Sequence, residues 1–174
     1  MAFDAPHSPA PTDDERELLL GFIRWQRDQV VATAEGLSDD QLRWTPEDRL
    51  LPIGGVINHL LHMEWRWIDG RYAGSPFPER EPEYTLPETM SGAEVIDAYG
   101  RQARRTEQIV RRAASLDEPC LGDEGGRGPA HVLLGFDTPI TLRWTLLHVL
   151  EETAHHAGHA DATREMLDGK KMRA

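Results

Sequence analysis

The chain has 174 residues, with 19 basic and 30 acidic side chains and a formal net charge of −11 at pH 7. This length fits one domain that buries its own core without disulfides or a structural metal. The negative charge argues against nucleic acid as a partner, because phosphate binding needs clustered Lys and Arg. No apolar run approaches the ~20 residues that span a bilayer, which argues against a membrane protein.

The single cysteine and the N-terminal sequence predict a cytoplasmic protein. Cys120 has no second cysteine in the chain to pair with, which favours a reducing compartment. The N-terminal sequence, MAFDAPHSPAPTDDERE, has neither the basic region nor the apolar region of a signal peptide.

Four long segments carry apolar residues at helical spacing, and none shows the alternation of a strand. The first helix is expected over residues 12–36, where Thr12 and Glu15 form a capping box. A short helix follows, and it opens on a second capping box, Ser38 with Gln41.

The second long helix is expected over residues 53–72. Residues 73–88 contain four prolines and must form a loop. A third capping box, Ser91 with Glu94, opens the third long helix. A Gly/Pro-rich connection over residues 115–139 follows, and long loops of this kind often act as lids or binding loops.

The fourth long helix is expected to start at Pro139, since proline favours the first helical position, and to end at Gly169. The chain shows no internal repeat and no second domain. Four amphipathic helices predict an all-α bundle over residues 12–169. Residues 1–11 are expected to form a disordered tail, and residues 170–174 a second tail.

The last helix carries a stripe of histidines where a solvated face would carry Lys, Arg and Glu. On a helical wheel, the members of this stripe lie within ~60° of its central carboxylate. They are Thr145, His148, Glu152, His155, His156, His159 and Thr163. The first half of the helix is apolar nearly all round otherwise, which predicts a buried helix facing a polar cavity. Farther along, Arg164 is expected to point away from the stripe as an ordinary solvating residue.

Residues four apart on a helix share a face, so both can bind one metal ion. The spacing allows Glu152 with His156, Glu151 with His155, and His155 with His159. Zinc and similar ions need at least three protein donors, so another helix must supply the third.

The second long helix offers that third donor. His59 lies at the edge of the apolar face and His62 lies nearly opposite its centre, so His59 is the better inward candidate. Glu64 lies near the middle of the same face, and a buried carboxylate must be paired with an arginine or be functional. The five tryptophans are expected mainly in the core, although they could instead line a substrate pocket.

These two helices resemble those of a known family. The NHLLHMEWRW helix, followed downstream by LRWTLLHVLEETAHHAGHADATREMLDG, resembles the DinB-like four-helix metalloproteins, above all an actinobacterial branch of unknown function. The resemblance covers most of the chain. It implies an up-down-down-up four-helix bundle, and its members are often homodimers.

The resemblance also implies a ligand set of His59, Glu152 and His156. Glu152 stands in place of the first histidine of the usual His-x-x-x-His pair. The resulting His, Glu, His ligand set is similar to that of mycothiol-dependent maleylpyruvate isomerase. His159 stands where the common motif has glutamine, so its role as ligand, supporting residue or proton shuttle stays open; we expect it to be catalytic. His155 is not expected to be a ligand.

Three protein ligands would leave an open position on a zinc or nickel ion, which is typical of catalytic sites. The resemblance implies that a low-molecular-weight thiol, mycothiol or bacillithiol, binds there as the thiolate. We therefore expect a thiol-dependent transferase or isomerase acting on a small electrophile. The alternative is a non-catalytic metal-binding bundle that binds a small ligand or partner in a stress response.

Other site classes fit less well. A ferritin-like di-iron protein needs Glu-x-x-His on two helices, and only residues 152–155 supply one. The His-Glu-x-x-His motif of zincins is absent, and no Gly-rich phosphate loop follows a predicted strand.

Overall fold

The computed structural model describes residues 8–46, 50–76, 82–122 and 134–170. These residues form helices and no strand, apart from one isolated bridge between Pro119 and Thr141. The elements are α1 (Glu15–Thr33), α2 (Asp39–Arg43), α3 (Ile53–Trp65) with its π-helical continuation η1 (Arg66–Tyr72), α4 (Gly92–Arg112) and α6 (Leu142–Asp168). None of the described helices combines the length and apolar character needed to cross a bilayer.

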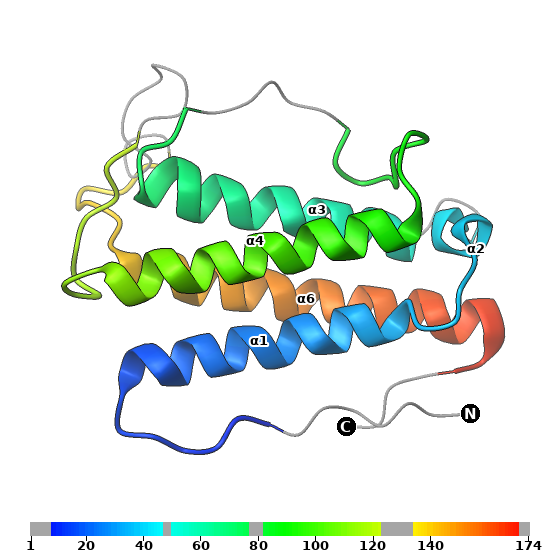
Figure 1. Ribbon diagram of the computed structural model, residues 1–174, viewed down its shortest axis with the longest axis horizontal. Helices are drawn as coiled ribbons and strands as arrows, with labels where there is room; N and C mark the ends of the chain where they lie inside the picture. Colours follow the sequence, from blue (N-terminus) through cyan, green and yellow to red (C-terminus); the bar gives the residue numbers. More distant parts are fainter. Residues whose placement is uncertain (1–7, 47–49, 77–81, 123–133, 171–174) are drawn as a thin grey trace.

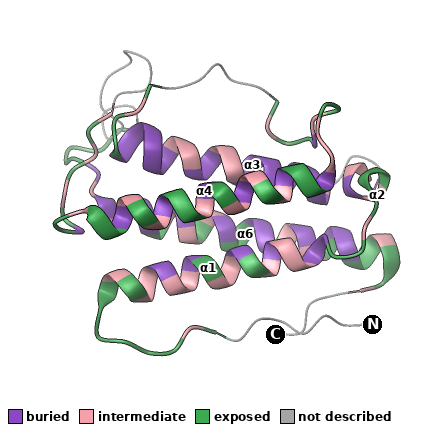
Figure 2. Ribbon diagram, in the orientation of Figure 1, coloured by how far each residue is buried: buried purple, intermediate pink, exposed green. Residues whose placement is uncertain are grey.

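The predicted up-down-down-up bundle is confirmed. In Figure 1, α1 and α6 run in one direction, and α3 and α4 run in the other. α1 packs mainly against α6, α3 packs against α4, and α3 also packs against α6. Figure 2 shows α3 as the most thoroughly buried of the four long helices, so a polar side chain on α3 must find a partner inside the bundle.

The helix starts follow the predicted capping chemistry at two of three places. The capping boxes at Ser38 and Ser91 are both present. The box predicted at Thr12 is wrong, because Asp14 caps α1 instead and accepts the backbone N–H groups two and three residues farther on. A carboxylate at this position also interacts favourably with the helix dipole.

The last helix starts later than predicted. Pro139 lies before α6, and Thr141 caps α6 by accepting from the N–H of Trp144. The segment before the cap pairs with the chain that follows α4, since the carbonyl of Ile140 accepts from the N–H of Cys120. The carbonyl of Ile140 is therefore hydrogen-bonded to a distant part of the chain and not within a helix.

Gly36 and Gly169 follow α1 and α6 in left-handed conformations, with φ of 72° and 76°. Gly169 ends α6 as predicted. α1 itself ends at Thr33, three residues before the predicted end. The predicted tails fall partly on residues 1–7 and 171–174, which lie outside the described residues.

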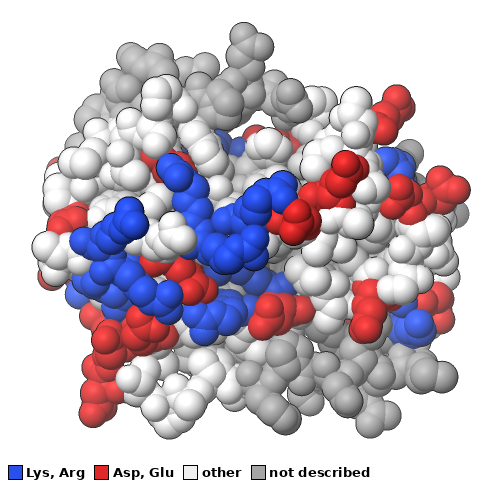
Figure 3. Space-filling model, in the orientation of Figure 1, with Lys and Arg blue, Asp and Glu red and all other residues white. Residues whose placement is uncertain are grey.

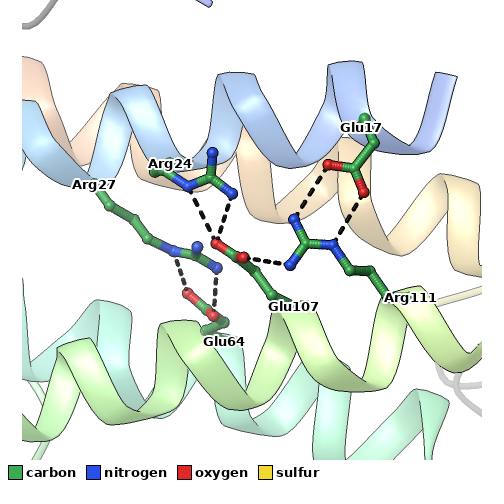
Figure 4. A network of polar contacts seen from close by, with 6 residues as sticks. All are labelled: Glu17, Arg24, Arg27, Glu64, Glu107 and Arg111. Atoms are coloured by element: carbon green, nitrogen blue, oxygen red, sulfur yellow. Dashed lines mark hydrogen bonds and ion pairs between the residues drawn. The ribbon is translucent and has the colours of Figure 1, made fainter. Parts of the chain in front are cut away.

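Glu64 is buried completely, and its partner is an arginine. Arg27 of α1 donates through Nε to one carboxylate oxygen at 3.0 Å and through Nη2 to the other at 2.5 Å. Figure 4 shows this pair beside a second, more exposed network between α1 and α4. That network contains Glu17, Arg24, Glu107 and Arg111. Of the two roles predicted for Glu64, the structure supports the paired, structural one.

Basic side chains of α4 lie on its outer face. Figure 3 shows Lys and Arg side chains gathered over α4 with acidic side chains among them. Arg101, Arg105 and Arg111 each form an ion pair with a carboxylate.

Arg164 does not face solvent, so this prediction is wrong. Its side chain is buried, and Nη1 donates to the carbonyls of Thr33 at 2.6 Å and Glu35 at 2.9 Å. Asp168 pairs with the same guanidinium. Because α1 and α6 run parallel, their C-terminal ends lie together, and a cation on α6 can satisfy the last carbonyl of α1 and a carbonyl just beyond its end.

Candidate metal centre

The three residues proposed as ligands converge between α3 and α6. Nε2 of His59 lies 3.9 Å from Oε2 of Glu152, and Nε2 of His156 lies 3.6 Å from the same oxygen. The two imidazole rings are 4.6 Å apart and tilted by 59°. One donor atom from each residue lies within 4.8 Å of the others. Residues one turn apart on α6 thus meet a single residue of α3.

The burial of this cluster fits metal binding. His59 and His156 are buried, at 4% and 7% exposed, whereas the Glu152 side chain is 30% exposed. Both nitrogens of His59 and Nδ1 of His156 make no hydrogen bond within the described structure. Buried polar atoms without partners are costly. Donors bound at ~2.1 Å to one ion lie ~3–4 Å apart, which the observed separations match.

The protonation states of His59 and His156 also fit metal binding. Burial lowers the pKa of His59, and the nearby Arg66 guanidinium lowers it further. Burial, together with the neighbouring imidazoles of His59, His159 and His155, lowers the pKa of His156 to about 4. Both rings are therefore neutral at pH 7, and the neutral imidazole is the form that binds a metal ion.

Two residues of the proline-rich loop, Glu83 and Tyr84, also contact His59. The ring stacks on Tyr84 at 4.4 Å, and Nδ1 lies 3.5 Å from a carboxylate oxygen of Glu83. Arg66 holds the other oxygen of Glu83, and Asn58 donates to its backbone carbonyl at 3.2 Å. A carboxylate behind a ligating imidazole orients the ring and raises its basicity.

The contact of Glu83 with His59 was not predicted from the sequence. The surrounding stretch also contains Glu79, Glu81 and Glu88, and no local pattern separates one of these acids from the others.

His155 and His159 lie beside the cluster, outside the group of three donors. His155 is exposed, and its ring meets that of His159 edge to face at 4.4 Å. His159 is half-buried, and its ring lies 5.4 Å from that of His156. The catalytic role expected for His159 stays a prediction.

The histidine stripe is only partly buried. Of its members, His155 is exposed, and His148, Glu152 and His159 are half-buried. In the first half of α6, Leu147 and Glu151 are exposed as well, so the prediction of a buried helix facing a polar cavity is wrong for this side of α6. α6 packs against α1, α3 and η1.

His148, one turn before Glu152, is half-buried between two tryptophans. Its ring stacks on Trp144 at 5.2 Å and meets Trp67 edge-on at 4.4 Å. Trp67 is buried, as a core residue should be, and it also contacts His148, which lies next to the candidate centre.

Comparisons with known proteins identify the fold and the family of this chain. A conserved protein from Enterococcus faecalis, whose crystal structure is known, has the same fold with a TM-score of 0.64 and 11% sequence identity. The alignment covers 91% of this chain and 100% of that one. None of the curated proteins matches the sequence. The model of the mycothiol S-transferase family matches residues 18–169, which include all three converging residues. The chain therefore belongs to the mycothiol S-transferase family, a DinB-like family of helical proteins.

Proposed function

We propose that this protein is a metal-dependent transferase that joins the thiol of mycothiol to a small electrophile. Membership of the family supports a mycothiol-related transferase at the family level. The observation that carries the metal-dependent part is the cluster of His59, Glu152 and His156. Its buried imidazoles are neutral, and both nitrogens of His59 and Nδ1 of His156 lack hydrogen-bond partners. These three residues would hold a zinc or nickel ion.

A bound ion of this kind would lower the pKa of a coordinated thiol, so that thiolate is available at neutral pH. Three protein donors leave room for such a ligand. His159 would accept the proton of the incoming thiol. Its Nδ1 is buried without a hydrogen-bond partner, and its ring lies beside His156.

The nucleophilic sulfur would come from the co-substrate. Cys120 is half-buried, and its Sγ lies 3.4 Å from Oγ1 of Thr145. Burial raises the pKa of the Cys120 thiol, which keeps it protonated and weakly nucleophilic at neutral pH. We infer that Cys120 takes no part in the transfer.

Metal content and thiol consumption test this proposal together. Purified protein is loaded with zinc or nickel, dialysed, and analysed for bound metal; mycothiol loss is then followed with a panel of small electrophiles. The wild type should retain metal and consume mycothiol, and the His59→Ala, His156→Ala double variant should do neither. His155→Ala is the matched control, because it removes an exposed histidine from the same helix.

Unchanged metal retention in the double variant would refute the ligand set. Metal binding without any consumption of mycothiol would instead support the alternative, a non-catalytic bundle that binds a small ligand. The homodimer and the cytoplasmic location stay predictions.

A further inference from the structure

A second group of potential metal ligands adjoins the first and shares Glu152 with it. This group consists of His148, Glu151 and Glu152, each offering one donor atom within 4.8 Å of the others. Nε2 of His148 lies 3.8 Å from Oε1 of Glu152, and Nδ1 lies 3.9 Å from Oε2 of Glu151. The other oxygen of Glu152, Oε2, is the one that faces the first cluster. One carboxylate thus directs its two oxygens at two different sets of donors.

The surroundings of His148 fix its ring. Trp144 stacks on one face at an interplanar angle of 22°, and Trp67 meets the ring at 65°. Ring contacts of this kind hold the imidazole plane without hydrogen-bonding its nitrogens. The side chain is 22% exposed, so solvent and ions reach it.

The spacing between these donors is too long for hydrogen bonds, which need ~2.7–3.2 Å. One ion binds a single nitrogen of His148, so only one of the two separations can be a spacing between ligands of that ion. The 3.8 Å between Nε2 of His148 and Oε1 of Glu152 is the spacing expected for two donors bound to one ion at ~2.1 Å each, and Glu151 offers its donor atom within 4.8 Å of the other two residues' donors. The residues stand at i, i+3 and i+4 of α6, so all three lie on one side of the helix.

We propose that His148, Glu151 and Glu152 hold a second divalent transition ion, joined to the first by the carboxylate of Glu152. The proposal rests on the proposed first site, because it shares one ligand with that site. Two-metal sites place their ions ~3.5–4 Å apart, a distance that one bridging carboxylate can span.

The second ion should bind more weakly than the first. The Glu151 side chain is 67% exposed and must be ordered to bind, whereas both histidines of the first cluster are already buried. One imidazole and two carboxylates also form a harder donor set than two imidazoles and one carboxylate.

Titration of metal-free protein with zinc, followed by calorimetry and elemental analysis, tests the inference. The wild type should bind about two ions per chain in two separate phases. His148→Phe should lose the weaker phase and keep the tighter one, because phenylalanine preserves the ring packing between Trp67 and Trp144 and removes the nitrogens. Glu151→Gln should do the same, and because Glu151 is exposed, this substitution leaves the packing of the bundle unchanged.

His155→Ala is the decisive control, since His155 and His159 form a second pair one turn apart that could capture a weak ion. It should leave both phases in place. Electron paramagnetic resonance adds a readout that stoichiometry does not give. In protein loaded with two manganese ions, magnetic coupling through Glu152 should broaden and weaken the signal of each ion.

Each contrary outcome has a distinct meaning. A wild type that binds one ion only, or a His148→Phe variant that still binds two, overturns the second site and leaves the first intact. Loss of the weaker phase in His155→Ala moves the ion to the exposed pair and overturns this assignment. Protein that binds no ion overturns the proposed function as well.

Discussion

Replacing Arg27 by methionine isolates the effect of one buried ion pair on the stability of the bundle. The substitution keeps an unbranched side chain of similar length and removes the charge that Glu64 faces. Glu64 is 0% exposed and Arg27 is 4% exposed, so no solvent can replace the lost guanidinium. Removing one partner of a buried pair costs ~3–5 kcal/mol, because the other charge stays buried without compensation.

The cost converts to a large change in melting temperature. At ~2–4 °C for each kcal/mol in a chain of this size, Tm should fall by ~6–20 °C. Arg24→Met is the matched control, since Arg24 lies on the same helix and pairs with Glu107, but its side chain is 49% exposed. Exposed pairs contribute only ~0–1 kcal/mol, so this control should shift Tm by a few degrees at most.

Urea denaturation followed by circular dichroism measures both variants, and the double variant Arg27→Met, Glu64→Leu completes the test. Replacing both partners by apolar side chains leaves no buried charge, so most of the lost stability should return. Equal losses for Arg27→Met and Arg24→Met would refute the reasoning. So would a double variant that is less stable than Arg27→Met alone.

Three further predictions concern the candidate centre. Chelation should lower Tm and leave the helical circular dichroism in place, because a ligand present at 100 times its Kd adds only ~2.7 kcal/mol, or ~5–11 °C here; complete unfolding with EDTA would instead make the metal structural. Metal analysis of single variants should show that Glu152→Ala and His156→Ala lose the ion, that His159→Ala keeps most of it and loses activity, and that His155→Ala is mild. An empty site in His155→Ala and His159→Ala, with metal retained in Glu152→Ala, would contradict the ligand set. Metal-free protein should lose stability as pH falls from ~6.5 towards 4, because the unfolded chain protonates His156 in a range where the folded chain does not. Thermal melts of the wild type and His156→Asn check this, and equal pH slopes would count against it.

Much of the fold could be predicted because helix signals are local. Apolar spacing placed all four long helices, and two of three capping boxes stand where the sequence put them. The same periodicity selected His59 over His62 as the inward histidine, and the structure buries His59. The ligand pair on α6 depended on the family resemblance as well, since the spacing alone allowed three pairs on that helix.

The partners of buried groups were decided only by tertiary structure. Arg164 looked like a solvent-facing residue, yet the parallel packing of α1 and α6 brings it to carbonyls at the end of α1 and just beyond it. Nothing local to Glu64 indicates which arginine it meets, and nothing local to His59 indicates Glu83. A helical wheel gives the direction of each side chain from its own axis, but which neighbour lies in that direction depends on how the helices cross. The approach of Glu152 to His59 follows from the same crossing of α3 and α6, whereas its approach to His148 is local to α6.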